Sequence, residues 1–106
     1  MRIQDDKIRQ ILTELESEVG VKYSGKKKER KAGLLALRFC GEWAFAQGVW
    51  EDKDISKTKC KEYVKFRIKE ESRYGSLITM ILVSVIAKLI AEWIINRFFD
   101  KIYDEG

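Results

Sequence analysis

Cys40 and Cys60 are the side chains of this chain best suited to nucleophilic, redox or metal chemistry. The sequence contains no histidine, so the usual general base for a cysteine or serine nucleophile is missing. A structural zinc ion takes about four cysteine or histidine ligands, which this chain cannot supply. Glycine motifs that hold nucleotide phosphates are also absent. We therefore predict no catalytic residue, no metal, no cofactor and no small-molecule substrate, and two reduced, packed thiols.

Lys88 and Glu92 are a second pair with chemical potential, because they stand four residues apart in an otherwise apolar segment. At helical spacing the two charges share one face and can form a salt bridge. Ionisable groups on an apolar helix can have shifted pKa values and a function. We favour the simpler interpretation, in which the two side chains form a structural pair.

The positive charge of the chain is concentrated in its middle. The protein has 106 residues and a net charge of +4. Residues 21–50 carry seven basic and two acidic side chains, an excess of five. Such an excess can bind nucleic-acid phosphates, an acidic protein surface or anionic lipid headgroups, and it can equally be a solvated loop. It comes chiefly from a basic cluster formed by Lys26, Lys27, Lys28, Arg30 and Lys31.

The apolar residues repeat at helical spacing along most of the chain. The absence of proline also favours helices, because proline breaks them. Segment 4–19 places its aliphatic side chains on one face, and Gly20 is predicted to end this helix. Segment 20–31 is predicted to be a loop that can run into the next helix. Segment 51–56 is predicted to be a turn, with the N-cap of the following helix at Asp54 or Ser56.

Segment 32–50 is predicted to be a core helix with small residues at every fourth position, namely Ala32, Ala36, Cys40, Ala44 and Gly48. A row of small side chains lets another helix approach closely. We expect the protein to assemble through this row and through the apolar helix 76–103. The predicted interface comprises Ala36, Cys40, Ala44, Ile81, Val85, Leu89 and Trp93.

Segment 57–74 carries two competing patterns. Val64, Phe66 and Ile68 alternate with charged residues, as in a strand, whereas Val64 and Ile68 also share one face of a helix. A strand without a partner is not stable, and no partner strand is visible. We therefore favour a basic helix that ends at Tyr74.

Segment 76–103 is apolar on nearly every side. Residues 77–87 carry no charge. A helix of this kind must be surrounded by protein or by lipid. We favour protein, with the helix at the centre of a small bundle that oligomerises to bury its remaining apolar surface. The polar residues form a single row, which is Ser84, Lys88, Glu92, Asn96 and Asp100.

The alternative surrounding is a membrane. Leu77 to Ile95 is 19 residues, or about 28 Å of helix, close to the ~30 Å hydrocarbon core of a bilayer. The flank before this segment is the more basic one, which would leave the N-terminus in the cytoplasm. Lys88 near the middle costs about 2.5–3.5 kcal/mol on insertion scales, which brings insertion close to balance.

One stretch carries a family resemblance. Cys60 lies in a basic helix, Tyr74-Gly75-Ser76 forms a junction, and Trp93-Ile94 closes an Ile/Leu/Val-rich helix. In these features residues 60–99 resemble the C-terminal half of small uncharacterised proteins of tailed bacteriophages. The resemblance implies a phage origin, and hence a small virion component or a host-membrane accessory. It implies no activity, because that family has none assigned.

The sequence therefore predicts an all-α domain spanning residues 1–106, with three or four helices, a long apolar C-terminal helix and an oligomeric state. The predicted function is that of a non-enzymatic interaction protein of a phage virion or its assembly. Its partners would be other copies or other virion proteins, in the virion or the host cytoplasm. One alternative is a single-pass or peripheral membrane accessory anchored by residues 76–99. The other is a helical protein that binds nucleic acid without sequence specificity.

Overall fold

Four helices make up the described part of the chain, and no strand occurs in it. The computed structural model describes residues 3–47, 52–72 and 85–103. The helices are α1 (Asp5–Lys22), α2 (Lys27–Gln47), α3 (Lys53–Ser72) and α5 (Val85–Tyr103). The all-α prediction is confirmed. The radius of gyration is 13.4 Å, which matches the ~13 Å of a compact domain of about 100 residues.

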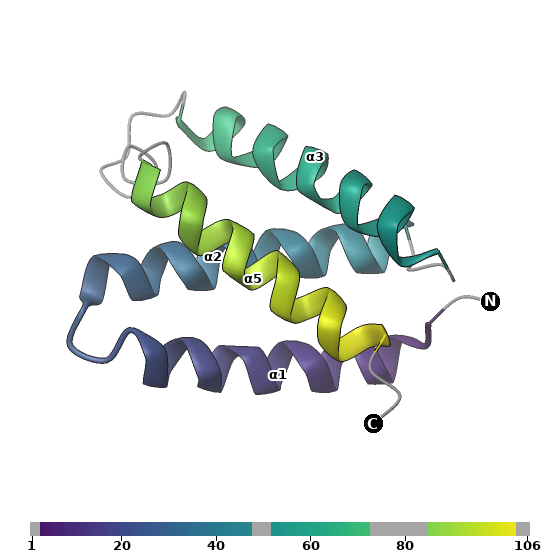
Figure 1. Ribbon diagram of the computed structural model, residues 1–106, viewed down its shortest axis with the longest axis horizontal. Coiled ribbons are helices and arrows are strands. Elements are labelled where there is room, and N and C mark those ends of the chain that lie inside the picture. Colours follow the sequence, from purple (N-terminus) through teal and green to yellow (C-terminus); the bar gives the residue numbers. More distant parts are fainter. Residues whose placement is uncertain (1–2, 48–51, 73–84, 104–106) are drawn as a thin grey trace.

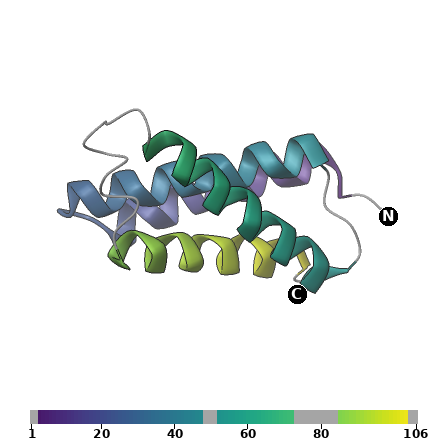
Figure 2. The same ribbon diagram turned by 90° about the horizontal axis from the view of Figure 1, so that it is seen from above.

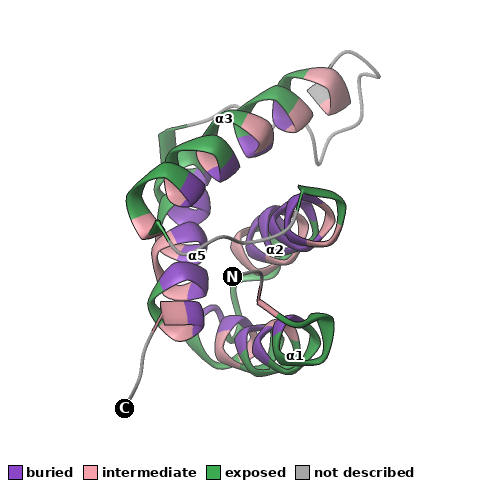
Figure 3. Cartoon of the chain, turned by 90° about the vertical axis from the view of Figure 1, so that its right-hand side faces the viewer, coloured by how far each residue is buried: buried purple, intermediate pink, exposed green. Residues whose placement is uncertain are grey.

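The arrangement of the helices places α5 against all three others (Figure 1). Helices α1 and α2 form an antiparallel hairpin, and α5 packs on both of them. Helix α3 covers the remaining side of α2 and α5, and does not touch α1 within the described residues (Figure 2). Buried positions face the interior, where the helices meet (Figure 3). Helix α2 likewise contacts the other three helices, so the core lies around α2 and α5.

Helix α1 buries the face that its spacing predicts, with Ile8, Leu15 and Val19 inaccessible to solvent. The prediction that Gly20 ends this helix is wrong, because α1 continues through Gly20 to Lys22. The chain turns instead at Gly25, whose φ of +77° is readily adopted only by glycine. Glycine at position 20 is an ordinary helical residue, and sequence alone does not separate it from a terminal one.

Helix α2 begins at Lys27, so the predicted loop 20–31 is much shorter than expected. The row of small residues lies inside the molecule, and Gly48 of that row is outside the described residues. Two glycines add to the close packing. A Cβ added at Gly33 would lie 3.1 Å from Val19 Cγ1, and one added at Gly41 would lie 3.0 Å from Leu12 Cδ1. Small side chains therefore let α1 and α5 approach α2.

Helix α3 confirms the helical interpretation of residues 57–72. Val64 and Ile68 are buried, whereas Phe66 between them is exposed, which is the burial pattern of a helix and not of a strand. Neither Asp54 nor Ser56 is the N-cap, because both lie within the helix. Asp52 caps it, with Oδ1 accepting a hydrogen bond from the Ile55 N–H at 3.0 Å. The predicted end at Tyr74 lies outside the described residues.

Helix α5 is the described part of the predicted helix 76–103 and has the most apolar composition of the four. Its buried face includes Ile94, Phe98 and Phe99, and Phe99 contacts the Trp43 ring of α2 at 5.9 Å between centroids. No helix within the described residues is both long and apolar enough to cross a bilayer. Residues 77–84 of the proposed span lie outside them.

We predict that Gly20→Ala stabilises the protein. An added Cβ at this position meets nothing within 4 Å. Alanine favours a helix over glycine by about 1 kcal/mol, so urea denaturation should show a free energy of unfolding higher by about 0.5–1 kcal/mol.

Gly25→Ala is the control, and it should destabilise by about 1–2 kcal/mol because its positive φ is strained for alanine. A loss of stability in Gly20→Ala would contradict the continuation of α1 through this residue.

Candidate functional site

The start of α5 carries the largest concentration of exposed apolar side chains in the described part of the chain. Val85, Ile86 and Leu89 are 72%, 59% and 62% exposed. Their spacing places them on one outward face of the helix. We call these three residues the apolar cluster. Apolar side chains grouped in this way, on a surface that is otherwise charged, indicate an interaction site.

The basic cluster lies at the same end of the molecule. Lys26 precedes α2, and the other members form its first turns, with the lysines exposed and Arg30 half-buried. The starts of α2 and α5 lie together in Figure 1. Contacts agree with this, because a Cβ added at Gly33 of α2 would lie 3.6 Å from Ile90 Cγ2 of α5. Lysines at a helix N-terminus oppose the helix dipole, so helix stability does not explain Lys27 and Lys28.

The predicted interface residues divide into two groups. Ala36, Cys40 and Ala44 are buried against other helices of the same chain, so a partner could not reach them without opening the bundle. Trp93 is half-buried and its ring meets Tyr23 edge to face, with 6.2 Å between centroids. Val85 and Leu89 are exposed. Ile81 lies outside the described residues.

Two acidic residues of the polar row of α5 form salt bridges with lysines of α3. Glu92 Oε1 lies 3.7 Å from Lys61 Nζ, and Asp100 Oδ1 lies 3.2 Å from Lys53 Nζ. The salt bridge of Glu92 in the described structure is therefore with α3 and not with Lys88, four residues away. Sequence reasoning missed this arrangement because the lysines of α3 gave no sign of which helix they face.

A second set of salt bridges joins α1 to α5. Glu18 Oε1 lies 2.8 Å from Arg97 Nη2, and Glu18 Oε2 lies 3.0 Å from Lys101 Nζ. Burial alone would raise the pKa of the Glu18 carboxyl, but hydrogen bonds from Lys101 and Arg97, together with their charges, lower it below its ordinary value. These salt bridges join residues far apart in the sequence, so the spacing of the glutamates within α1 does not predict them.

A polar network joins α2 to α3. Glu42 Oε2 accepts hydrogen bonds from the Tyr63 hydroxyl at 3.2 Å and from Arg67 Nε at 3.3 Å. The Arg67 guanidinium also lies over the Phe39 ring, 4.8 Å from its centroid. These contacts orient α3 on α2, and they leave the Tyr63 hydroxyl already engaged.

The two thiols contact each other in the core. Cys40 of α2 and Cys60 of α3 are fully buried and not joined by a disulfide. A hydrogen bond to the Cys60 thiol, together with burial, raises the pKa of Cys40 well above its ordinary value. A protonated, inaccessible thiol is a poor nucleophile. Within the described residues, no group of cysteine and acidic side chains could hold a metal ion.

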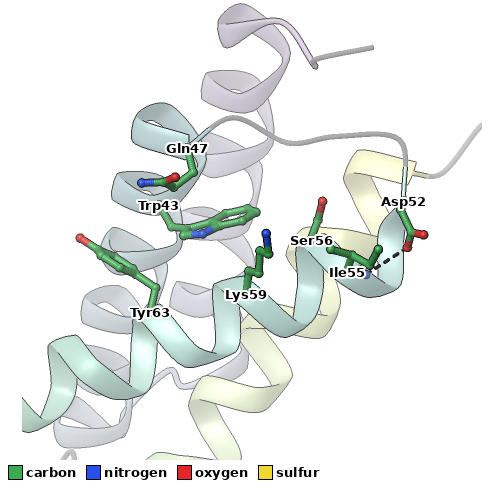
Figure 4. A pocket seen from close by; sticks show the side chains of 7 residues that line it. All are labelled: Trp43, Gln47, Asp52, Ile55, Ser56, Lys59 and Tyr63. Atoms are coloured by element: carbon green, nitrogen blue, oxygen red, sulfur yellow. Dashed lines mark hydrogen bonds between the residues drawn. The ribbon is translucent and has the colours of Figure 1, made fainter.

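An open cleft of about 440 Å³ lies between α2 and the first turns of α3 (Figure 4). The Trp43 indole forms one side, and the Lys59 side chain points toward it. None of these side chains was predicted from sequence to share a site, because α2 and α3 come together only in the fold. The lining residues are Trp43, Gln47, Asp52, Ile55, Ser56, Lys59 and Tyr63.

No family model, curated protein or solved structure matches this chain.

We predict that Glu18→Gln lowers the free energy of unfolding at pH 7 by about 0.5–1.5 kcal/mol, the contribution of partly exposed charged hydrogen bonds. Because the folded-state pKa of Glu18 is lowered, its contribution is complete above the unfolded pKa near 4.5 and disappears as the pH falls through the folded pKa. The difference between wild type and variant should therefore shrink below pH 4.5.

Urea unfolding over a pH series measures this difference, with the exposed Glu16→Gln as the matched control. A difference between wild type and Glu18→Gln that does not vary with pH would contradict the proposed role of this carboxylate.

Proposed function

We propose that the protein is a non-enzymatic interaction protein that self-associates through the start of α5. The observation that carries the proposal is the exposure of Val85, Ile86 and Leu89 on a helix whose other apolar residues are covered by α1, α2 and α3. Covering these side chains by a partner removes apolar surface from water, at about 25 cal/mol per Å².

A surface that fits this cluster exists on the same chain. A groove of about 530 Å³ runs between α1 and α2, and its apolar lining includes Leu12, Leu34 and Phe45. Arg38 also lines the groove and is paired with Glu42, whereas the exposed Glu16 is left to complement Lys88, which is exposed beside the apolar cluster. A second copy of the chain would therefore offer the apolar cluster an apolar groove and offer Lys88 a carboxylate.

The geometry of this contact is head to tail. The apolar cluster lies on α5, whereas the groove is lined by residues of α1 and α2, so the two copies would meet through different surfaces. A contact between two different surfaces repeats from copy to copy, and it builds a ring or a filament. Such assemblies suit a small virion or assembly component, which is the setting that the phage resemblance of residues 60–99 implies.

We predict a native mass above the 12.4 kDa of one chain when the protein is measured without detergent by light scattering during size-exclusion chromatography. Leu89→Ser should shift the mass toward one chain, because it removes apolar surface from the contact. Ile55→Ser is the matched control, since Ile55 is also exposed but lies on the first turn of α3. A single-chain mass for wild type at every concentration would reject self-association.

Binding to an anionic membrane surface is the second candidate. It is favoured by the position of the basic cluster, which shares one end of the molecule with the apolar cluster. Apolar side chains that enter the headgroup region, surrounded by lysines, form a peripheral membrane site. Each lysine near an anionic surface contributes about 1 kcal/mol.

Vesicle sedimentation separates the two candidates. A peripheral membrane protein should sediment with phosphatidylglycerol vesicles and not with phosphatidylcholine vesicles. The double variant Lys27→Gln, Lys28→Gln should then lose binding, whereas Lys59→Gln, Lys65→Gln, which changes two exposed lysines of α3, should retain it. No sedimentation with either lipid would reject the membrane candidate.

A further inference from the structure

The two cysteines of the chain meet between α2 and α3. Cys40 and Cys60 come from different helices and are both 0% exposed, and a hydrogen bond joins their thiols. We propose that the two thiols are a redox-sensitive pair, which a small-molecule disulfide oxidises to a Cys40–Cys60 bond that locks α3 onto α2. The pair lies inside the bundle, so the proposal is independent of self-association through surface residues. It departs from the sequence-based expectation that both thiols stay reduced.

The contacts around the pair hold the two thiols beside each other. A disulfide forms without strain only where the backbone already brings the two sulfur atoms close together. The Tyr63 hydroxyl of α3 donates to Glu42 Oε2 of α2 at 3.2 Å, and Arg67 Nε donates to the same oxygen at 3.3 Å. Each cysteine lies within about one helical turn of this network. The network therefore keeps α2 and α3 in register at the level of the thiols.

Helix α3 is the element whose opening can expose the pair. It has the most polar composition of the four helices, and its buried apolar residues are Cys60, Val64 and Ile68. It does not touch α1 within the described residues, and its salt bridges to α5 are partly exposed, so they contribute little to stability. Local opening of a weakly packed element costs less free energy than global unfolding. A dissolved reagent therefore reaches both thiols when α3 separates from α2.

Opening of α3 also makes the thiols reactive. In the closed structure, the hydrogen bond to the Cys60 thiol and burial raise the pKa of Cys40 well above its ordinary value. The thiolate is the nucleophile in disulfide exchange, so the closed pair is inert. A thiol in water has a pKa of about 8.5 and is partly ionised at neutral pH. Sensitivity to an oxidant is therefore confined to the open state.

Oxidation proceeds by two exchange steps with a disulfide such as oxidised glutathione. The thiolate of one cysteine attacks a glutathione sulfur, forms a mixed disulfide and releases one glutathione thiolate. The thiolate of the other cysteine then attacks the protein sulfur of the mixed disulfide, which forms the Cys40–Cys60 bond and releases the second glutathione. The protein loses two protons and two electrons, and the oxidant becomes two glutathione thiols.

The first test incubates the folded full chain with oxidised glutathione until the reaction stops. The sample is then quenched in acid, denatured and alkylated, and its mass and peptide map are measured. We expect a Cys40–Cys60 bond within one chain and no thiol left to alkylate. Two alkylated thiols, a persistent mixed disulfide with glutathione, or a disulfide between two chains would each overturn the proposal.

Variants test whether α3 is the part that opens. Arg67→Met removes the hydrogen bond from α3 to Glu42, so it should speed oxidation about threefold to tenfold. Arg97→Met is the matched control, because it removes a salt bridge between α5 and Glu18 of α1, and its rate should stay close to that of wild type. Equal acceleration in the two variants would identify global unfolding as the route and overturn the opening of α3.

Hydrogen–deuterium exchange tests the lock itself. In the oxidised protein the amides of α3 should exchange at least about tenfold more slowly than in the reduced protein, because the bond prevents α3 from leaving α2. The amides of α1 are the internal reference and should change less, since α3 does not touch α1 within the described residues. Cys60→Ala, compared before and after treatment with the oxidant, should show no slowing. Unchanged exchange of α3 after oxidation of wild type would overturn the lock.

Discussion

The need to cover an apolar helix is the constraint on which the structure depends. Helix α5 packs against α1, α2 and α3, and its residues Ile94, Phe98 and Phe99 are buried among them. Phe98 and Phe99 also meet edge to face, with 5.3 Å between centroids. Because α1 and α3 do not touch within the described residues, each depends on α2 and α5 for its position. Removing α5 would leave α1 and α3 joined only through α2 within the described residues.

Two features turn this apolar contact into a defined arrangement. Small residues of α2 allow close approach, and salt bridges from both sides fix the neighbours of α5. Glu18 joins α1 to Arg97 and Lys101, and Lys61 joins α3 to Glu92. Such partly exposed pairs contribute little stability individually, about 0–1 kcal/mol each. Their effect is to select which face of each helix meets α5.

Much of the fold could be predicted from sequence, because periodicity identifies a buried face. The buried side of α1 followed from spacing alone, whereas the helical state of α3 followed from spacing together with the absence of a partner strand. The ends of the helices did not follow from spacing, because Gly20 and Gly25 are chemically identical and only the backbone conformation distinguishes them. The candidate sites were also less predictable. Val85 and Leu89 of the apolar cluster belong to the predicted interface and Ile86 does not. The cleft between α2 and α3 was not predicted, because the contact between these helices depends on tertiary packing.

The apolar cluster lies on the part of α5 that no other helix covers, and the two clefts lie between neighbouring helices. These candidate surfaces therefore depend on an intact core. Phe98→Ala, compared with Phe66→Ala, tests this account most directly by urea denaturation. Phe98 is 0% exposed on α5, and Phe66 is 56% exposed on α3. We expect Phe98→Ala to lower the free energy of unfolding by about 3–5 kcal/mol, and Phe66→Ala to change it by no more than about 0.5 kcal/mol. Equal effects of the two substitutions would contradict the central position of α5.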